Sequence, residues 1–302
     1  MFRTIVAGCN GFERGRGAVS LAHAIAAATG ARLVVLGVHH NPPLPFPDTY
    51  AEQRAELERA LRAVRDELAP EAIVRVHADL SPARALRHVA EAEHADLIVV
   101  GSRHRRRLQH ILEGDRAMQV LHGAGCAVAI APDPLAPHPE LQKIGIGIDA
   151  TPESERALAL ARDLAERTGA HLWLHAVVDD SLSGWDGIAP MGGPADVYET
   201  IIASRVSMAR DLLAERLEAC RGLPADGTVV VGSPTGELVL ASEGMDLLVL
   251  GSRRWGPVRR LALGSTSERV IRHAACPVLV PPRDGASEHG DAATVGDEAA
   301  MR

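Results

Sequence analysis

The chain has 302 residues, of which 46% are hydrophobic and 24% charged, a composition typical of a soluble globular protein with one large or two modest domains. Its net charge of −7 and its few aromatic residues (three Phe, three Trp and two Tyr) argue against nucleic acid as a partner, because phosphates require basic residues and bases require stacking platforms. No apolar run approaches the roughly 20 residues that span a bilayer, so no membrane association is expected.

The first residues, MFRTIVAGCN, read as a strand rather than as a signal peptide. The four cysteines lie far apart, without disulfide-framework or metal-ligand spacing, which predicts reduced thiols and a cytoplasmic protein. Lys143 is the one lysine of the sequence, so the GK[ST] ending of a Walker A loop is absent. The fourteen histidines lack HExxH spacing, which favours surface histidines over a metal site.

An internal repeat divides the chain into two similar copies. Residues 95–132 align with 245–282 at a constant offset of 150, and residues 29–38 align with 168–177 at an offset of 139. A duplicated domain of this size is not a short-period solenoid. We therefore predict a first domain over 1–135 and a second over 141–283. The remaining tail, 284–302, has little to bury and is expected to be disordered.

Each copy alternates strands and helices. In the second copy, KIGIGID (143–149) predicts a strand, and the next helix is expected to take Thr151 as its N-cap, Pro152 as its first residue and Gly169 as its end. The later elements are expected as strands at 170–178, 228–232, 245–252 and 276–282, and as helices at about 196–221, 233–242 and 265–275. Apolar strands separated by helices indicate two tandem doubly wound α/β domains of the Rossmann-like class, each with a five-stranded parallel sheet.

Ligands of such sheets bind beyond the carboxyl ends of the strands, where the strand order reverses. The fourth strand of the second copy leads into GSRRWGPVRRLALGSTSERV (251–270), which combines three glycines, several arginines and four hydroxyl residues around the start of a helix. A helix N-terminus with close-approaching glycines and added donors suits a phosphate group. The alternative is a capping box, with Ser265 as N-cap and Glu268 reaching back. Gly251 and the intervening arginines favour the anion site.

The order and spacing of these segments resemble the universal stress protein family over nearly the whole chain. Its nucleotide-binding members carry Gly-x2-Gly-x9-Gly-[Ser/Thr] after the fourth strand, and this sequence keeps the spacing from Gly251 to Gly264 with Arg254 in place of the second glycine. The resemblance implies ATP, with or without Mg²⁺, in the second domain. The residues it assigns to the nucleotide are Asp149, Val177, Gly251, Arg253, Arg254, Gly264, Ser265, Thr266 and Ser267. For Asp149, a role in starting the Thr151 cap is an equal alternative.

The first copy provides an internal comparison. Asn10 stands at the position of Asp149, and Asp115 at the position of Ser265. Aspartate caps a helix as well as serine does, but a carboxylate beside a phosphate repels it by on the order of 1 kcal/mol or more. We therefore expect the first domain to bind ATP weakly or not at all.

Three functions remain open at this point. The first is an ATP-binding regulator of stress or dormancy with little or no turnover, acting through an unknown protein partner. The second is a slow Mg²⁺-dependent ATPase, and the third is a partner-binding scaffold without nucleotide. The resemblance also implies pairing of the terminal strands, 126–131 with 276–281, which would make the chain a pseudo-dimer, alone or within a further homodimer.

Overall fold

The computed structural model describes residues 1–11, 15–39, 47–102, 116–132, 134–181, 195–252 and 264–282. The first copy comprises β1 (Thr4–Gly8), α1 (Arg16–Thr29), β2 (Arg32–His39), α2 (Pro47–Leu68), β3 (Ile73–Ala78), α3 (Pro82–Ala92), β4 (Leu97–Gly101), α4 (Arg116–Leu121) and β5 (Ala127–Ala131). The second comprises β6 (Lys143–Ile148), α5 (Pro152–Thr168), β7 (His171–Val178), α6 (Ala195–Ala219), β8 (Ala225–Val231), α7 (Pro234–Ser242), β9 (Leu247–Val249), α8 (Ser265–His273) and β10 (Val278–Val280). The tail at 284–302 lies outside the described residues.

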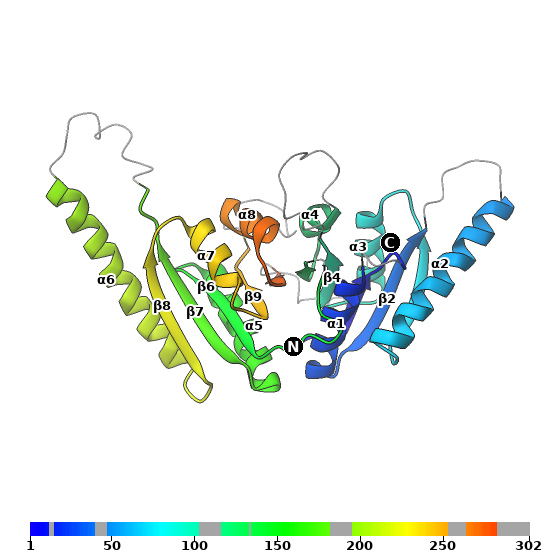
Figure 1. The fold of residues 1–302 in the computed structure, drawn as a ribbon, viewed down its shortest axis with the longest axis horizontal. Coiled ribbons are helices and arrows are strands. Elements are labelled where there is room, and N and C mark those ends of the chain that lie inside the picture. Colours follow the sequence, from blue (N-terminus) through cyan, green and yellow to red (C-terminus); the bar gives the residue numbers. More distant parts are fainter. Residues whose placement is uncertain are drawn as a thin grey trace, which may run out of the picture.

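One ten-stranded sheet runs through both copies (Figure 1), with the strand order β3-β2-β1-β4-β5-β10-β9-β6-β7-β8. Strands within each copy pair in parallel, whereas β5 and β10 pair antiparallel, Val278 opposite Ile130 and Val280 opposite Val128. The predicted doubly wound class and the predicted pairing of the terminal strands are both confirmed. The two halves therefore join edge to edge within one chain.

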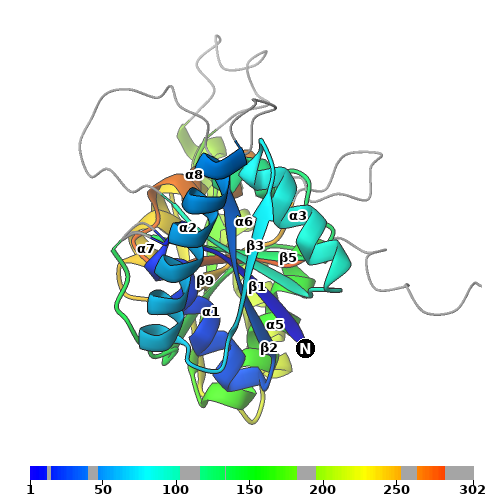
Figure 2. The same ribbon diagram turned by 90° about the vertical axis from the view of Figure 1, so that its right-hand side faces the viewer.

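Helices cover both faces of the sheet, as Figure 2 shows for α2 and α3 on either side of β2 and β3. Apolar side chains of α1, α2, α5 and α6 fill one core layer, and those of α3, α4, α7 and α8 fill the other. This two-sided cover explains why the central strands are apolar along their whole length.

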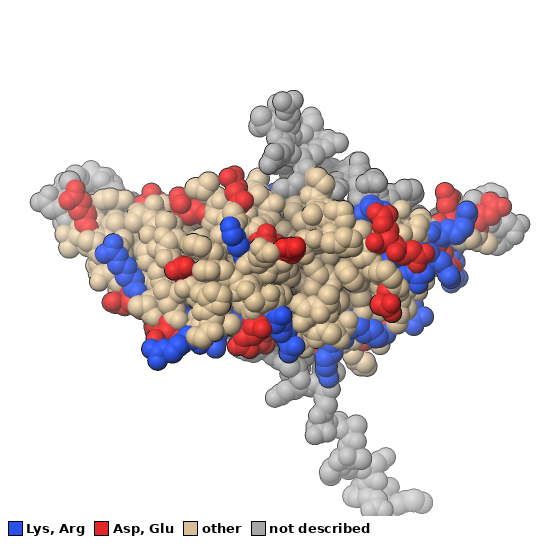
Figure 3. Space-filling view, turned by 60° about the horizontal axis from the view of Figure 1, so that its bottom comes forward, with Lys and Arg blue, Asp and Glu red and all other residues tan. Residues whose placement is uncertain are grey.

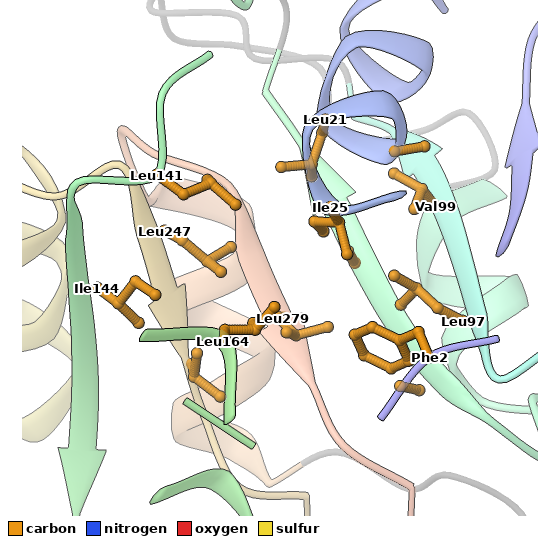
Figure 4. Close-up of a cluster of buried hydrophobic side chains, with 14 of the residues drawn as sticks. Phe2, Leu21, Ile25, Leu97, Val99, Leu141, Ile144, Leu164, Leu247 and Leu279 are labelled. Atoms are coloured by element: carbon orange, nitrogen blue, oxygen red, sulfur yellow. The ribbon is translucent and has the colours of Figure 1, made fainter. Parts of the chain in front are cut away.

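The first core layer is continuous between the copies. Figure 4 shows Ile25 of α1 next to Leu279 of β10, with Leu141 and Leu247 of the second copy beyond it. The connection between the copies adds to this layer, since Leu135 packs against it and a Cβ on Gly17 would come within 3.2 Å of the Leu135 Cβ. The copies thus share a core rather than merely a sheet edge.

The helix that leads into the second copy's carboxyl edge begins and ends as predicted. The Thr151 hydroxyl of α5 accepts a hydrogen bond from the Ser154 N–H, and Pro152 is the first helical residue. Gly169 ends the helix in the left-handed conformation, with φ of 71°, which glycine adopts without steric cost.

Three strands differ clearly in length from their predictions. The strand predicted at 276–282 spans only Val278–Val280, after Pro277, which has no N–H to donate to a neighbouring strand. The strand predicted at 245–252 is shorter, because Asp246 lies in the preceding turn and accepts hydrogen bonds from the Gln142 and Lys143 N–H groups. The strand predicted at 228–232 begins earlier, at Ala225, because pairing with β7 holds Asp226 and Gly227 in register despite their low strand propensity.

Acidic and basic side chains are interspersed on the face seen in Figure 3. Exposed ion pairs of this kind, such as Arg221 with Glu218 at 2.7 Å, contribute little to stability. In the described part of the chain, no helix combines the length and the apolarity that crossing a bilayer requires.

Candidate functional site

The carboxyl edge of the second copy's sheet contains a topological switch point. β6 lies between β7 and β9, and the chain leaves β6 toward α5 on one face but leaves β9 toward α8 on the other. Diverging connections of this kind open a crevice above the strand ends, where ligands of doubly wound sheets bind. Asp149 follows β6, Asp179 follows β7, and Leu250 alone separates Gly251 from the end of β9.

Asp149 is exposed at the end of β6 and organises the turn into α5. Its Oδ1 accepts hydrogen bonds from the Thr151 N–H at 2.9 Å and from the Thr151 hydroxyl, and its own N–H donates to the Ser154 Oγ at 3.0 Å. The structure thus shows the expected role of Asp149 in the Thr151 cap. Asp149 is exposed at this edge of the sheet, so its carboxylate can also accept a hydrogen bond from a ligand hydroxyl.

Gly251 lies against the backbone of α5. A Cβ at this position would approach the Glu153 carbonyl carbon to 2.9 Å and its oxygen to 3.0 Å, closer than side chains tolerate. At Gly101, the equivalent position in the first copy, no described atom lies within 4 Å of such a Cβ. Gly251 therefore permits a close approach of α5 to the end of β9.

The helix that follows begins differently from the capping box considered above. Gly264, with φ of −72° and ψ of 157°, is the N-cap of α8, and no side chain in the described residues caps it. Ser265 is the first helical residue, and the Glu268 side chain pairs with Arg272 at 2.8 Å instead of reaching back. The capping-box alternative is wrong. The helix begins one residue earlier than that motif requires, so Ser265 lies inside the helix and its side chain is not at the capping position.

The start of α8 is tied to the end of β9 by Ser267. Its hydroxyl donates a 3.0 Å hydrogen bond to the Gly251 carbonyl. Ser265 is exposed, and Thr266 and Ser267 are half-buried. The first N–H groups of a helix have no intrahelical acceptor, so this end presents amides together with hydroxyls and the positive end of the helix dipole. Such an arrangement is chemically suited to an anion.

The sequence did not predict two buried polar side chains near Gly251. Ser252 is only 6% exposed, and its Oγ has no hydrogen-bond partner among the described residues. Glu153 is 9% exposed, with one oxygen 3.1 Å from the Arg156 Nη2 and the other unpartnered in the described structure. Nothing in the sequence distinguishes these positions from ordinary helix and loop residues, because their burial depends on the packing of α5 against β9.

The remaining predicted residues are only partly placed. Val177 lies near the end of β7 and is half-buried, with its side chain packed against the second core layer. Arg253 and Arg254 lie outside the described residues, as does Asp115 of the first copy. The described structure therefore brings Asp149, Gly251 and residues 264–267 to one edge of the sheet.

Histidines and cysteines are chiefly structural. Among the residues that the structure describes, no group of three His, Cys, Asp or Glu could hold a metal ion. The expectation of surface histidines is wrong for His39, which is 8% exposed and lies edge-on to Tyr50, because β2 ends beneath α2. Burial raises the pKa of the Cys126 and Cys276 thiols to about 12, consistent with core packing rather than redox chemistry.

Comparison with known proteins identifies the family. Residues 1–132 and 140–282 each match the universal stress protein family. Universal stress protein Rv2623 of Mycobacterium tuberculosis is 34% identical over 68% of this chain and 68% of its own length. Universal stress protein Rv2005c of the same organism is 28% identical over 79% of this chain and 81% of its own length.

Solved structures support the fold independently. The crystal structure of a universal stress protein from Archaeoglobus fulgidus superposes with a TM-score of 0.62 at 21% identity, covering 93% of this chain and 96% of that one. Protein PA1789 from Pseudomonas aeruginosa gives a TM-score of 0.61 at 17% identity, with 94% of each chain covered. With both halves matched and the resemblance seen in the sequence confirmed, the chain belongs to the universal stress protein family as a tandem member.

Proposed function

We propose that the second copy binds an adenine nucleotide, ATP, at the carboxyl edge of its sheet, and that the protein acts as a nucleotide-responsive regulator of stress or dormancy. The phosphates would lie at the start of α8, over Gly251, Gly264 and the hydroxyl residues 265–267. The ribose would lie near Asp149, and the adenine near Val177.

The observation that carries this proposal is the uncapped N-terminus of α8. Within the described residues, Gly264 leaves the first amides of the helix without a side-chain acceptor, although three hydroxyl residues follow directly. The Ser267 bond to the Gly251 carbonyl fixes this end of the helix against β9. A prearranged set of donors at a helix dipole is the basis of phosphate binding in many nucleotide sites.

Family membership supports the same assignment, because the Gly-Ser pairs stand at the spacing of the nucleotide-binding members. Arg253 and Arg254 would add cationic donors beside the phosphates. A bound Mg²⁺ would neutralise part of the charge on the phosphates. Nucleotide occupancy would change the surface around residues 251–267 that a protein partner reads.

Binding is the better-supported activity compared with catalysis. Neither a paired nucleophile and base nor a metal-ligand cluster is present in the described part of the site. The first copy, with Asn10 and Asp115 in place of Asp149 and Ser265, would bind the nucleotide weakly. The proposed stoichiometry is therefore one nucleotide per chain.

Titration calorimetry with ATP and Mg²⁺ tests the proposal. The wild-type chain should bind one ATP, and Ser265→Asp should weaken binding about tenfold or more, because its carboxylate opposes the phosphates across a short distance. Ser265→Asn is the matched control, since it has nearly the same size and starts the helix without charge; it should retain most of the affinity. If Ser265→Asp binds as tightly as Ser265→Asn at equal stability, the phosphate position is wrong.

The alternatives give different results in parallel assays. Phosphate release under multiple turnover that is abolished by Ser265→Ala would identify a slow ATPase. A folded chain that binds no adenine nucleotide, in calorimetry or after acid release from purified protein, would instead be a partner-binding scaffold.

A further inference from the structure

The outer strand of the second copy, β8, leaves one edge of the sheet open. Among the described strands it pairs only with β7. The Leu172 N–H donates to the Pro224 carbonyl at 2.9 Å, and the Gly232 N–H donates to the Val178 carbonyl at 3.0 Å. Alternation along the strand therefore directs the N–H and C=O groups of Ala225, Gly227, Val229 and Val231 away from β7.

Most of this edge strand lacks the features that normally prevent edge-to-edge pairing; its one charged residue, Asp226, lies 2.8 Å from the His171 Nε2 of β7. The segment 228–231 reads Thr-Val-Val-Val, without a charge or a proline. Val231 is 46% exposed, and α6, which packs on β8, adds the exposed apolar side chains of Tyr198 and Met208. Both elements lie in the same arm of the molecule in Figure 1. Exposed apolar groups beside a free strand edge indicate an interaction surface.

The strand at the opposite end of the sheet, β3, carries basic side chains that oppose edge-to-edge pairing. β3 carries Arg75 and His77 on one face, and Arg75 lies 3.6 Å from Glu93. Two β3 strands paired antiparallel would set these basic side chains against each other, which disfavours association. The contrast between the two copies shows that the fold itself does not require an edge strand with an uncharged Thr-Val-Val-Val segment.

We propose that β8 pairs with β8 of a second copy of this chain, antiparallel about a two-fold axis. The register that overlaps the whole strand places Thr228 opposite itself, Gly227 opposite Val229 and Asp226 opposite Val230. No like charges face each other in this register, and threonine pairs are favourable cross-strand neighbours. This inference does not depend on the proposed nucleotide site.

A second copy fits this edge better than an unrelated strand for two reasons. A closed two-fold dimer uses the same surface on both partners, and the β8 sequence is compatible with itself in that arrangement. The chain also already joins its two halves by antiparallel pairing of short apolar strands, β5 with β10. The dimer would extend that continuous sheet across a further edge.

Disulfide trapping tests the register. In the proposed dimer the residues at 228 form a non-hydrogen-bonded pair, whose Cα atoms lie about 4.5 Å apart, within the range of a disulfide. Thr228→Cys should therefore give a covalent dimer under mild oxidation. Val231→Cys is the matched control, since it is exposed on the same strand but faces Ala225 of the partner, and it should remain uncrosslinked. The native thiols give little background because Cys9, Cys220 and Cys276 are buried and because burial raises the pKa of the half-buried Cys126 to about 12.

Sedimentation analysis over a range of concentrations tests the interface without new cysteines. Wild type should dimerise reversibly, and Thr228→Lys should lower the association constant about tenfold or more, because two lysines would meet at the axis. Because the Thr228 side chain is exposed, the Thr228→Lys chain should unfold at the same temperature as the wild-type chain. Ala78→Lys on β3 should dimerise like wild type. A monomeric wild-type chain, a dimeric Thr228→Lys variant, or equal crosslinking at 228 and 231 would overturn the proposal.

Discussion

At the scale of single residues, the site depends on close contacts that the sequence conceals. Gly251 reads as part of a phosphate-binding motif, yet its most direct structural reason is the Glu153 backbone that packs against it. The two explanations are compatible, because the same packing of α5 against the end of β9 leaves Asp149 and the start of α8 at one edge of the sheet. A glycine retained for packing can thus shape a ligand site indirectly.

Substitution of this glycine should cost stability. A methyl group in Gly251→Ala would lie 2.9 Å from the Glu153 carbonyl carbon, so we expect a loss of about 1–3 kcal/mol in the free energy of unfolding. Gly101→Ala, at the open equivalent position, should be nearly neutral. Urea unfolding of both variants checks the difference. Equal effects would show that the contact with Glu153 is not the cause of the loss.

His175 should make the stability depend on pH. Burial lowers the pKa of His175, and its Nε2 has no hydrogen-bond partner in the described structure. The folded state therefore favours the neutral imidazole. The contribution of His175 to the free energy of unfolding is fully present above about pH 6.5 and is lost as the pH falls below that value. Unfolding of His175→Leu, which introduces the leucine found at Leu36 in the first copy, should depend less on pH between 7.5 and about 5.5. An unchanged pH dependence would contradict this assignment.

At the scale of elements, helix starts distinguish what sequence can and cannot predict. The Thr151-Pro152 start and the Gly169 end of α5 were predictable, since caps, proline and glycine act locally. The first residue of α8 was predicted correctly as Ser265, but its cap was not, because the pattern from Ser265 to Glu268 suggests a capping box whereas the N-cap is Gly264. The tie between Ser267 and Gly251 is a tertiary contact, which local patterns cannot reveal.

The N-cap residues of α5 and α7 should differ in how much they contribute to the free energy of unfolding. Thr151→Ala removes a side-chain cap of α5 and should cost about 1 kcal/mol of unfolding free energy. Ser233→Ala is a matched control, because Ser233 precedes α7 without making a side-chain cap bond. Denaturant midpoints of the two variants check this. A larger loss at Ser233 would mean that the assigned cap does not stabilise α5.

At the scale of the whole molecule, the duplicated fold was predictable from the sequence repeat and the alternation of strands and helices. The antiparallel pairing of β5 with β10 followed from the family resemblance rather than from any local pattern. The continuous core beneath it was not predicted, because it depends on which faces of α1 and β10 meet. Neither Phe2 nor Leu135 carries a sequence signal for this contact.

A shared core should couple the unfolding of the two copies. Leu279 is fully buried where the halves meet, so Leu279→Ala should cost about 2–5 kcal/mol. Calorimetry should show a single transition that moves to lower temperature. Two separate transitions, of which the substitution shifts only one, would indicate that the halves unfold independently.

The central claim, that nucleotide phosphates lie at the start of α8, is tested most directly by amide hydrogen exchange with and without ATP. Nucleotide should slow the exchange of the Ser265, Thr266 and Ser267 amides, while the corresponding helix start of the first copy remains unaffected. Bound ATP that leaves these three amides unprotected, or that protects the first copy instead, would contradict the account.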